Sequence, residues 1–457
     1  MRGHLGTNDD NRTVKIQPLF FRNSLRIQPG QAIHDSLAEE DLTLITQDVQ
    51  SQRDRLHAFS VDDLVLFFNA VSMDWSRRDH LVQKSYRNLG INFLLHWFRR
   101  NHLQELLQQS FRGNPLYLDS FQSVNSTGSY HLRAQPRGLA VHWLAGNVPV
   151  LGMLSWSMSI LTKNVSILKV SARNPWALPF LLDQIRPITV TGAKGATIRG
   201  EDIARTVAVV YYSKSNIEAS QYLSAQADVR IAWGGKEAIE AIMGLRRSLG
   251  SEDVIFGPKT SFAVVGKEYL SDLALATSVA SKIGHDASVF DQQGCNSPHT
   301  VFVEGGESVT PQHFAELLAG EMQRQELRMP SERTSESDAL VILNKRAEYD
   351  LRGSAWYPEG TNWSVLYSDA DRGLADPCYS RTLFVRPVRD VLEVADYCGK
   401  LTQTVGCALS SERKSVFAEK VSYAGIDRCP DVGLMSLYDS PWDGIFPMDR
   451  MVRWVKA

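Results

Sequence analysis

The feature that most constrains this chain is an alternation of short apolar stretches with longer helix-like stretches, which begins at Gly138. Each apolar stretch has the length of a strand that is buried on both faces, and the segments between them have helical length and spacing. Strands that alternate with helices favour a parallel sheet covered by helices on both sides. The strands predicted in this first series are 139–144, 165–170, 207–212, 229–233 and 262–265, and the predicted helices include 149–161 and 175–185.

A second series of the same kind follows Cys295, which predicts a second α/β unit. The chain of 457 residues is long enough for two or three domains. The predicted strands of this series are 300–303, 339–343, 382–385 and 404–409, and its predicted helices are 311–323 and 391–400.

The segment upstream of Gly138 has a different pattern. Residues 1–50 are interpreted as irregular, and Ser60 with Asp63 predicts a helix N-cap ahead of residues 64–75. A further helix is predicted over 91–107, and residues 114–136 alternate as a β-hairpin does.

Composition excludes several classes of function. The net charge of −2 does not favour nucleic acid or an acidic membrane surface as a partner. The N-terminal residues contain no apolar core of a secretory signal, and the longest apolar stretch, 148–161, is interrupted by Gly152 and three serines and is too short for a membrane span. The five cysteines show no CxxC spacing, so we expect no zinc site and no disulfide framework, and a cytoplasmic location.

Cys295 is the strongest candidate for a nucleophile. It follows Gly294 in a polar segment between a helical stretch and a strand, so we expect its thiol on a loop that a substrate can approach. The alternative is an inert, partly exposed cysteine. His285 and His299 are near in sequence but are interpreted as structural, and the histidine and asparagine of a cysteine protease cannot be located.

Two further candidates stand at the ends of predicted strands. Asn147 follows the strand 139–144, and its amide could stabilise an oxyanion; alternatively, it caps the next helix. Lys169 ends the next strand and could reach ribose hydroxyls or a phosphate; alternatively, it is a solvated strand end. The glycines at 192, 195 and 200 do not form a GxGxxG fingerprint between a strand and a helix.

Taken in order, these segments resemble the aldehyde dehydrogenase superfamily from about residue 132 to the C-terminus. The likeness is greater to its acyl-CoA reductase branch, the LuxC-type long-chain acyl-protein thioester reductases. Four segments carry the resemblance. They are Gly146-Asn147-Val148-Pro149, Lys169-Val170-Ser171-Ala172, Trp233-Gly234-Gly235-Lys236 and Gly294-Cys295; the tail from Cys429-Pro430 through Trp442-Asp443-Gly444 to Trp454 resembles the reductase branch in particular.

The resemblance implies a role for each of these segments. Cys295 takes the position of the catalytic cysteine, and Asn147 that of the oxyanion-stabilising amide. Lys169 and Ser171 stand where the superfamily contacts the adenosine ribose, and Gly234, Gly235 and Lys236 stand at the turn near the cofactor pyrophosphate.

Two departures from the superfamily pattern are informative. Ile255 replaces the glutamate that activates hydrolytic water in oxidising members, which favours exchange between thioesters over hydrolysis to an acid. Ala172 replaces the glutamate that commonly contacts the ribose hydroxyls, and Arg173 adds positive charge beside Lys169, so we predict NADPH rather than NADH. Residues 381–388 lack the glutamate of the superfamily's Glu-x-Phe-Gly-Pro motif, so no contact to the nicotinamide ribose is assigned.

The resemblance implies an aldehyde-dehydrogenase-like α/β fold with two Rossmann-like parallel-sheet domains. The expected division is an NADP-binding domain over 1–262 with an oligomerisation hairpin at 116–136, a catalytic domain over 263–425, and a C-terminal segment over 426–457 that returns to the cofactor and oligomerisation region. A homo-oligomer, dimer or tetramer, is expected.

The implied reaction is the reduction of an acyl-CoA or acyl-protein thioester to an aldehyde through an acyl-Cys295 intermediate. An acyl-loading synthetase subunit is a possible partner. Two alternatives stay open: an NAD(P)-dependent, CoA-acylating aldehyde dehydrogenase, and a non-reducing scaffold that only carries the acyl group.

Overall fold

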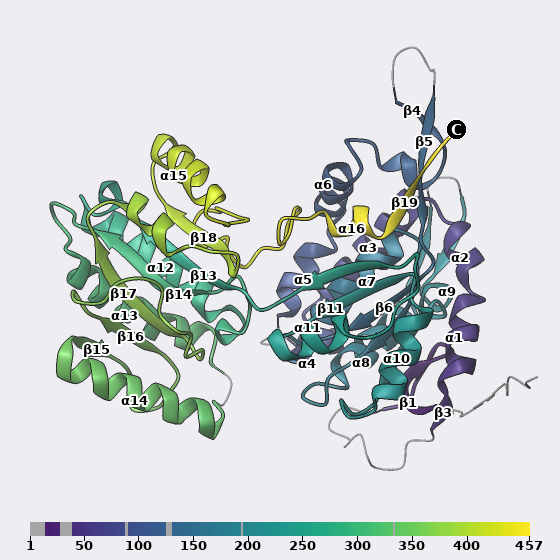
Figure 1. The fold of residues 1–457 in the computed structure, drawn as a ribbon, viewed down its shortest axis with the longest axis horizontal. Helices are drawn as coiled ribbons and strands as arrows, with labels where there is room; N and C mark the ends of the chain where they lie inside the picture. Colours follow the sequence, from purple (N-terminus) through teal and green to yellow (C-terminus); the bar gives the residue numbers. More distant parts are fainter. Residues whose placement is uncertain (1–13, 28–38, 87–89, 125–129, 193–194, 332–333) are drawn as a thin grey trace, which may run out of the picture. The chain divides into compact units, whose positions relative to one another are not determined.

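A computed structural model describes residues 14–27, 39–86, 90–124, 130–192, 195–331 and 334–457. The chain forms two compact units (Figure 1). Unit 1 comprises residues 1–82, 94–256 and 447–457, and unit 2 comprises residues 83–93 and 257–446. This division falls at 256 rather than at the expected 262, and the returning segment starts at Pro447 rather than at residue 426.

Unit 1 is built on a sheet that has eight strands among the described residues, with β12-β11-β6-β7-β10-β1-β2 as its main path and β3 paired with β1. The five strands from β6 to β12 in this sheet are parallel, whereas β1 runs antiparallel to β10 along one side. The strands of the sheet are β1 (Lys15–Phe21), β2 (Ser24–Leu25), β3 (Glu40–Asp41), β6 (Leu139–Trp143), β7 (Val165–Lys169), β10 (Val207–Tyr211), β11 (Val229–Trp233) and β12 (Glu252–Phe256).

Helices accompany this sheet, and α7 is buried along almost its whole length. The helices of unit 1 are α1 (Leu42–Gln50), α2 (Arg53–His57), α3 (Val61–Trp75), α6 (Arg100–Ser110), α7 (Leu151–Leu161), α8 (Ala177–Ile185), α9 (Gly200–Ala204), α10 (Ile217–Gln226), α11 (Lys236–Met243), α16 (Pro447–Arg450) and the 3₁₀ helix η1 (Pro115–Leu118). The division between the units falls within α4 (Leu81–Tyr86) and α5 (Ile91–Trp97).

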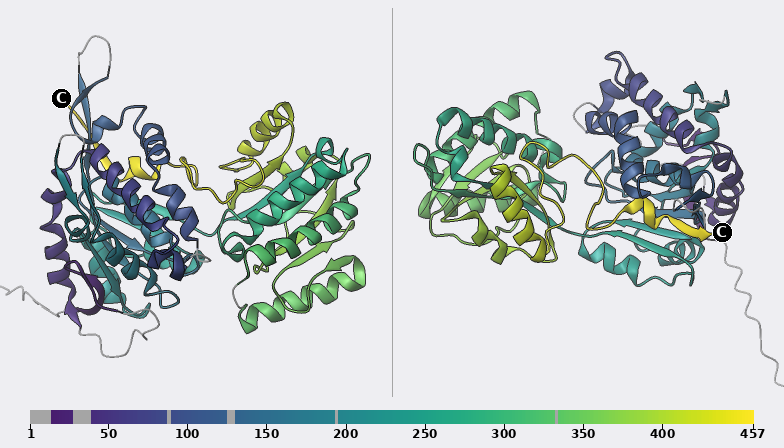
Figure 2. Two further views of the ribbon diagram at one scale, coloured as in Figure 1. Left: turned by 180° about the vertical axis from the view of Figure 1, so that it is seen from behind. Right: turned by 90° about the horizontal axis from the view of Figure 1, so that it is seen from above.

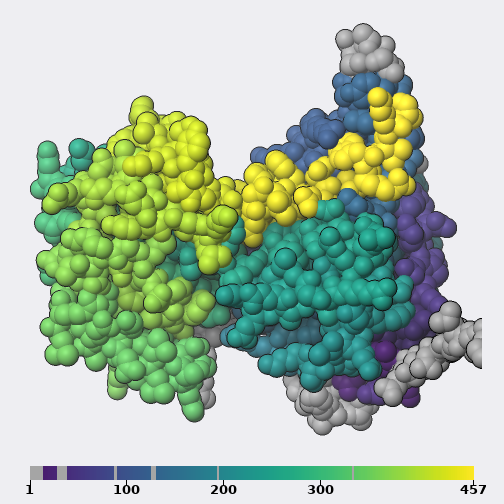
Figure 3. Space-filling view, in the orientation of Figure 1, coloured from purple at the N-terminus to yellow at the C-terminus, as the bar shows by residue number. Residues whose placement is uncertain are grey.

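Two smaller sheets complete unit 1. One is a hairpin of β8 (Thr189–Thr191) and β9 (Thr197–Arg199). The other joins β4 (Gln122–Ser123), β5 (His131–Pro136) and β19 (Val452–Lys456), so the C-terminal strand lies beside the hairpin (Figure 3). Of the predicted 116–136 hairpin, only β4 and β5 pair, because the residues up to Leu118 belong to η1; the tip lies outside the described residues.

Unit 2 is built on a second sheet, which among the residues described has six strands in the order β15-β16-β17-β14-β13-β18. All neighbours are parallel except β15 with β16. The strands are β13 (Thr260–Val265), β14 (Pro298–Glu304), β15 (Ser354–Trp356), β16 (Ser364–Tyr367), β17 (Thr382–Val388) and β18 (Thr402–Ala408). The helices are α12 (Leu273–Ser288), α13 (Pro311–Arg328), α14 (Glu336–Arg352), α15 (Ser411–Tyr423) and the 3₁₀ helices η2 (Lys267–Tyr269), η3 (Val289–Gln292) and η4 (Val391–Tyr397).

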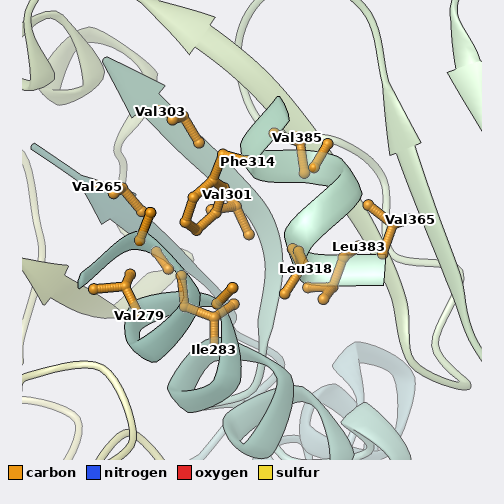
Figure 4. Packing of buried hydrophobic residues seen from close by; sticks show 14 of the residues in the cluster. Val265, Val279, Ile283, Val301, Val303, Phe314, Leu318, Val365, Leu383 and Val385 are labelled. Atoms are coloured by element: carbon orange, nitrogen blue, oxygen red, sulfur yellow. The ribbon is translucent and has the colours of Figure 1, made fainter. Parts of the chain in front are cut away.

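Successive residues of these strands point to opposite faces, so both faces of the second sheet are apolar and both are covered (Figure 2). Val265, Val301 and Val303 pack with Ile283 of α12 and Phe314 of α13 (Figure 4). Residues that alternate with these along β13 and β14 face the other side of the sheet and form a separate core. There Phe262, Val264 and Phe302 pack with Val394 of η4 and Phe417 of α15.

Most predicted strands and helices are confirmed, and α3 begins with the expected capping box of Ser60 and Asp63. Four predictions of local structure were wrong. Residues 1–50 are not irregular where they are described, because they contain β1 and α1. The helix predicted over 91–107 is interrupted between α5 and α6, and residues 391–397 form a 3₁₀ helix rather than an α-helix to 400.

The fourth error is instructive: the apolar run 339–343, predicted as a strand, lies inside helix α14. Ile342, Arg346 and Tyr349 recur at helical spacing and are buried, whereas Leu340 and Val341 are exposed. The helix is fixed at its start by the Ser335 hydroxyl, which accepts a hydrogen bond from the Asp338 N–H.

Candidate active site

The carboxyl ends of the unit 1 strands gather the residues expected to bind a dinucleotide. From β6 the sheet extends to β7 and β10 on one side and to β11 and β12 on the other. Ligands of open α/β sheets bind at the carboxyl edge where the strand order reverses in this way. Asn147 follows β6, Lys169 ends β7, and Gly234 follows β11, so all three lie at this edge.

The turn after β6 depends on a glycine. A side chain at Gly146 would place its Cβ 2.7 Å from the Ser171 Oγ and 2.9 Å from the Arg173 Cβ, so only glycine lets this turn approach the loop after β7. The half-buried Asn147 is not the cap of α7, because the N-cap residue is Val150. The alternative interpretation of Asn147 as a helix cap was therefore wrong.

Lys169 ends β7 with its ammonium group near an aromatic ring. Among the described residues no ion pair is found for it, and its Nζ lies 5.5 Å from the centre of the Tyr212 ring. The Tyr212 hydroxyl is held by the Trp143 Nε1–H at 3.1 Å and by Ser220 at 3.3 Å. Burial lowers the pKa of Lys169 from its usual 10.5, so the alternative of a fully solvated strand end was also wrong.

The loop after β7 presents a second cation. The Ser171 Oγ accepts a hydrogen bond from the Arg173 N–H at 3.3 Å, which orders the start of this loop. The Arg173 side chain is exposed, and no ion pair is found for it among the described residues. Ala172, beside it, is exposed as well. The loop therefore offers positive charge and no carboxylate at the residues that the resemblance assigns to the adenosine ribose.

The turn after β11 leads directly into a helix. Gly235 is the N-cap of α11, and Lys236 begins the helix with its side chain exposed and its Nζ 4.0 Å from Glu240. Trp233 anchors the turn, since its ring stacks on Phe256 at 3.7 Å and its Nε1–H donates to the Ser155 Oγ at 3.0 Å. Free N–H groups at such a helix start attract anions.

In unit 2, Cys295 lies on a loop between η3 and β14, as expected. The chain reaches it through Phe290, Asp291 and Gln292, which all have positive φ. Such a run is costly for residues with side chains and needs support from its surroundings. Gln292 supplies part of it, donating to the backbone oxygens of Pro298 and Thr382 and accepting from the Thr382 N–H at 2.7 Å.

The residues that flank the thiol are also fixed. The Ser261 hydroxyl donates to the Cys295 carbonyl oxygen at 2.7 Å, and Asn296 donates to the Met435 carbonyl oxygen at 2.8 Å. A side chain at Gly294 would meet the Asn296 Oδ1 at 2.6 Å. The loop is therefore held between β13 and the segment 427–446, and the thiol has a defined position.

The surroundings of the thiol are polar but enclosed. Cys295 is half-buried, and burial, together with the nearby negative charge of Asp443, raises its pKa to about 12; a hydrogen bond from Gln403 and the charge of Arg428 act in the opposite direction. Cys295 lies on a loop, as expected, but its thiol is less open than expected, because buried polar side chains surround it.

Neither nearby histidine has the character of a base for this thiol. His299 is buried with its ring against that of Tyr379 at 5.4 Å, and burial lowers its pKa to about 4. Burial also lowers the pKa of His285.

Within the part of the chain that the structure describes, no three His, Cys, Asp or Glu side chains gather as a metal site. No single described helix has the length and apolarity of a membrane span; one pair bent by 105°, 42–57 with 61–75, passes that test only when the two helices are combined.

Comparison with known proteins identifies the family. The sequence profile of the acyl-CoA reductase (LuxC) family matches residues 56–454. The chain belongs to this family. It is 28% identical over 337 residues to long-chain acyl-protein thioester reductase 2 of Photobacterium leiognathi, and 28% identical over 338 residues to the long-chain acyl-protein thioester reductase of Aliivibrio fischeri. These matches cover 72% of the chain but only 66% and 65% of the relatives' own lengths.

Solved structures confirm the fold. Aldehyde dehydrogenase 21 from Physcomitrella patens matches with a TM-score of 0.63 at 12% identity, covering 99% of this chain and 95% of that one. An NADP-dependent enzyme of E. coli matches with a TM-score of 0.64 at 11% identity, covering 99% of both chains. The prediction of an aldehyde-dehydrogenase-like α/β fold, and that of membership in the LuxC branch, are confirmed.

For this LuxC-family chain, the sequence did not reveal the polar residues around the thiol. Gln403 follows the start of β18, and Arg428 and Asp443 come from the long segment after α15. Asp443 stands in the tail that resembles the reductase branch, but nothing in its local pattern assigned it a role. The Asp443 carboxylate is only 6% exposed, and a buried carboxylate of this kind indicates a role near the thiol. Its burial is visible only in the structure.

Proposed function

We propose that this LuxC-family chain is an acyl-thioester reductase in which Cys295 accepts the acyl group of an acyl-CoA or acyl-protein and the group leaves as an aldehyde. The observation that carries the proposal is the thiol itself: one cysteine on a supported loop, surrounded by polar side chains, in a chain that matches the acyl-CoA reductase family over 56–454. A thiolate is the nucleophile suited to exchange of a thioester.

Asn147 is assigned to the stabilisation of the oxyanion that forms when the acyl carbonyl is attacked. An amide N–H is a suitable donor for that charge. Ile255, near the end of β12, occupies the position of the glutamate base of oxidising relatives, and an aliphatic side chain cannot activate water. The acyl-enzyme is therefore protected from hydrolysis, which favours reduction over formation of a free acid.

The residues of unit 1 fit a nicotinamide dinucleotide, and NADPH in particular. Lys169 has no acidic partner among the described residues and lies at the carboxyl edge of a parallel sheet, where a ribose or phosphate can bind it. Ser171 and Arg173 are assigned to the ribose and its 2′-phosphate, because Ala172 removes the competing carboxylate. Gly234, Gly235 and Lys236 are assigned to the pyrophosphate. Bound NADPH would supply the hydride.

The test follows the acyl group on the protein. Wild type and Cys295→Ala are incubated with a fatty acyl-CoA alone, and adducts are located by mass spectrometry; NADPH is then added and aldehyde is measured. We expect an acyl adduct on Cys295 that disappears as aldehyde forms, and neither in Cys295→Ala. Cys398→Ala, which removes another half-buried thiol, is the matched control and should behave as wild type.

Three outcomes would overturn the proposal. Acylation or turnover retained in Cys295→Ala would exclude the thiol as the acyl acceptor. An adduct that persists with NADPH would identify a scaffold that only carries the acyl group. Turnover that forms acid or acyl-CoA from an aldehyde and NADP⁺, with no reduction of acyl-CoA, would identify an aldehyde dehydrogenase.

We also propose that the chain works in the cytoplasm as a homo-oligomer, a dimer or tetramer. All five cysteines are free thiols, which suits a reducing compartment. The sheet of β4, β5 and β19 offers strands through which subunits can associate. A synthetase subunit that loads the acyl group is the partner expected from the family. Light scattering of the purified chain tests the homo-oligomer, and light scattering with such a synthetase added tests their association.

A further inference from the structure

A buried carboxylate near a nucleophilic thiol needs an explanation. The Asp443 side chain is 6% exposed, and its negative charge raises the pKa of the Cys295 thiol. That effect opposes catalysis, because the thiolate and not the thiol attacks a thioester. With its pKa raised to about 12, the Cys295 thiol stays protonated near neutral pH. The carboxylate therefore disfavours the resting thiolate, and it also provides a group that can take up the thiol proton.

One side chain connects the two groups. The Gln403 amide nitrogen donates a hydrogen bond to the Asp443 carboxylate, and the Gln403 side chain also forms a hydrogen bond with Cys295. Gln403 itself is completely buried, and both its neighbours along β18 are buried. A single fixed amide thus contacts both the thiol and the carboxylate, so the two groups belong to one hydrogen-bonded cluster.

The other charged groups around this pair are already engaged. Lys259 forms its ion pair with Asp427 at 2.5 Å and is 4.0 Å from Asp443. Arg428 pairs with Asp439 at 2.9 Å, donates to the backbone oxygens of Met435 and Leu437, and lies over the Trp442 ring. The titratable groups that face Asp443 are Cys295, Lys259, Asp427, Arg428 and Tyr438.

Asp443 is the member of this cluster best suited to accept a proton. Burial raises its pKa above the usual 3.8, so its neutral form is accessible. Gln403 has no ionisable proton, and burial raises the pKa of Tyr438 far above its usual value, so Tyr438 stays protonated. The two cations, Lys259 and Arg428, already hold their protons. When Asp443 becomes neutral, the repulsion that suppresses the Cys295 thiolate disappears, so the two ionisations are coupled.

We propose that Asp443 takes the proton of Cys295 as the thiol attacks an acyl thioester, and returns it to the thiol that leaves. This deepens the proposed function and rests on it. The S–H bond of Cys295 breaks, its proton moves to the Asp443 carboxylate, and the sulfur forms a bond to the acyl carbon. The bond from that carbon to the carrier sulfur then breaks, and the carrier thiolate takes the proton from Asp443. The acyl group has exchanged sulfurs, nothing is oxidised or reduced, and the carboxylate is restored.

The test separates proton exchange from simple electrostatics. The first measurement is the single-turnover rate of acylation of Cys295 by saturating fatty acyl-CoA without NADPH, as a function of pH. The second is alkylation of Cys295 by iodoacetamide, whose iodide leaves without needing a proton. The variants are Asp443→Asn, Asp443→Glu and, as the matched control, Asp431→Asn, which changes an exposed carboxylate of the same segment.

Asp443→Asn removes the charge that holds the thiol pKa up, so alkylation near neutral pH should be as fast as in wild type or faster. Acylation should fall by about 10²-fold, the usual contribution of a positioned acid–base group. The loss is expected in acylation and not in alkylation because the carrier thiolate takes up a proton as it leaves, whereas iodide does not. Asp443→Glu should restore part of the acylation rate, and Asp431→Asn should match wild type in both assays.

Acylation that is unchanged in Asp443→Asn, or that rises together with alkylation, would overturn the proposal and leave Asp443 as an electrostatic neighbour. If Asp443→Asn loses both reactions, Asp443→Glu decides: recovery supports proton exchange, and no recovery refutes it. Wild-type enzyme that forms no adduct on Cys295 would instead refute the proposed function, so the two failures are distinguishable.

Discussion

Replacement of Asp286 by asparagine is expected to flatten the pH dependence of stability. Asp286 lies in the last turn of α12 and is 1% exposed. Its carboxylate accepts hydrogen bonds from the Gly433 N–H at 2.5 Å and the Met435 N–H at 3.2 Å. Because the Met435 carbonyl in turn holds Asn296, this carboxylate anchors the segment that supports the Cys295 loop.

The magnitude follows from linkage between protonation and folding. Burial raises the pKa of Asp286 from 3.8 to about 7, although the N–H groups oppose the shift. An acid with a raised pKa in the folded state stabilises the fold below its unfolded pKa, and this stability is lost as the pH rises to the folded pKa. At ~1.4 kcal/mol for each pH unit, the wild type should lose ~2.5 kcal/mol between about pH 5 and about pH 8 through this group alone.

The assay is urea unfolding of wild type and Asp286→Asn near pH 5 and near pH 8, followed by circular dichroism. The asparagine cannot ionise, so its free energy of unfolding should not fall with pH through this group. Relative to wild type, the variant should therefore gain ~2.5 kcal/mol of unfolding free energy as the pH rises. Its loss of one acceptor oxygen adds an offset that does not depend on pH. Asp431→Asn, an exposed acid, should show no such change.

Parallel pH profiles for wild type and Asp286→Asn would refute the reasoning. A difference of the opposite sign would show that the N–H donors outweigh burial, because a carboxylate held by several backbone N–H groups can have a depressed pKa.

Two further substitutions test the sites directly. Lys169→Met should weaken NADPH binding by about 10- to 100-fold, because a charge-assisted hydrogen bond is lost. It should not lower thermal stability, because the cation that it removes is desolvated. Calorimetric titration measures the affinity, with the exposed Lys400→Met as control, and equal affinity would contradict the assigned contact. Gly406→Ala places a Cβ 2.4 Å from the Met435 Sδ, so it should displace the segment beside β18, lower the melting temperature and slow acylation of Cys295, whereas an unchanged acylation rate would exclude that support.

Much of the fold could be predicted from the sequence because the signal is local. The strand β10, for example, is a continuous apolar stretch, since helices cover both faces of the sheet. The capping box of α3 is encoded within four residues. The motif residues Asn147, Lys169 and Cys295 could be selected for the same reason, because each lies at the end of an element with a clear pattern. Family resemblance then gave them proposed roles.

Local patterns failed where burial depends on a distant partner. The run 339–343 contains strand-forming residues, but it became part of α14 because only one stripe of that helix finds a surface to cover. Likewise, β1 could not be recognised within residues 1–50, because it pairs antiparallel with β10, nearly two hundred residues further along the chain.

By itself, the sequence determined the alternation of strands and helices, and with it the α/β class and the loop that carries Cys295. The tertiary structure alone decided that Gln403 and Asp443 accompany the thiol, because β18 brings the segment 427–446 alongside it through the pairs Thr404 with Arg428 and Cys407 with Asp431. Periodicity specifies which face of an element is apolar, but not which distant segment lies against that face. The charge near the sulfur, and therefore its reactivity, depends on that second choice.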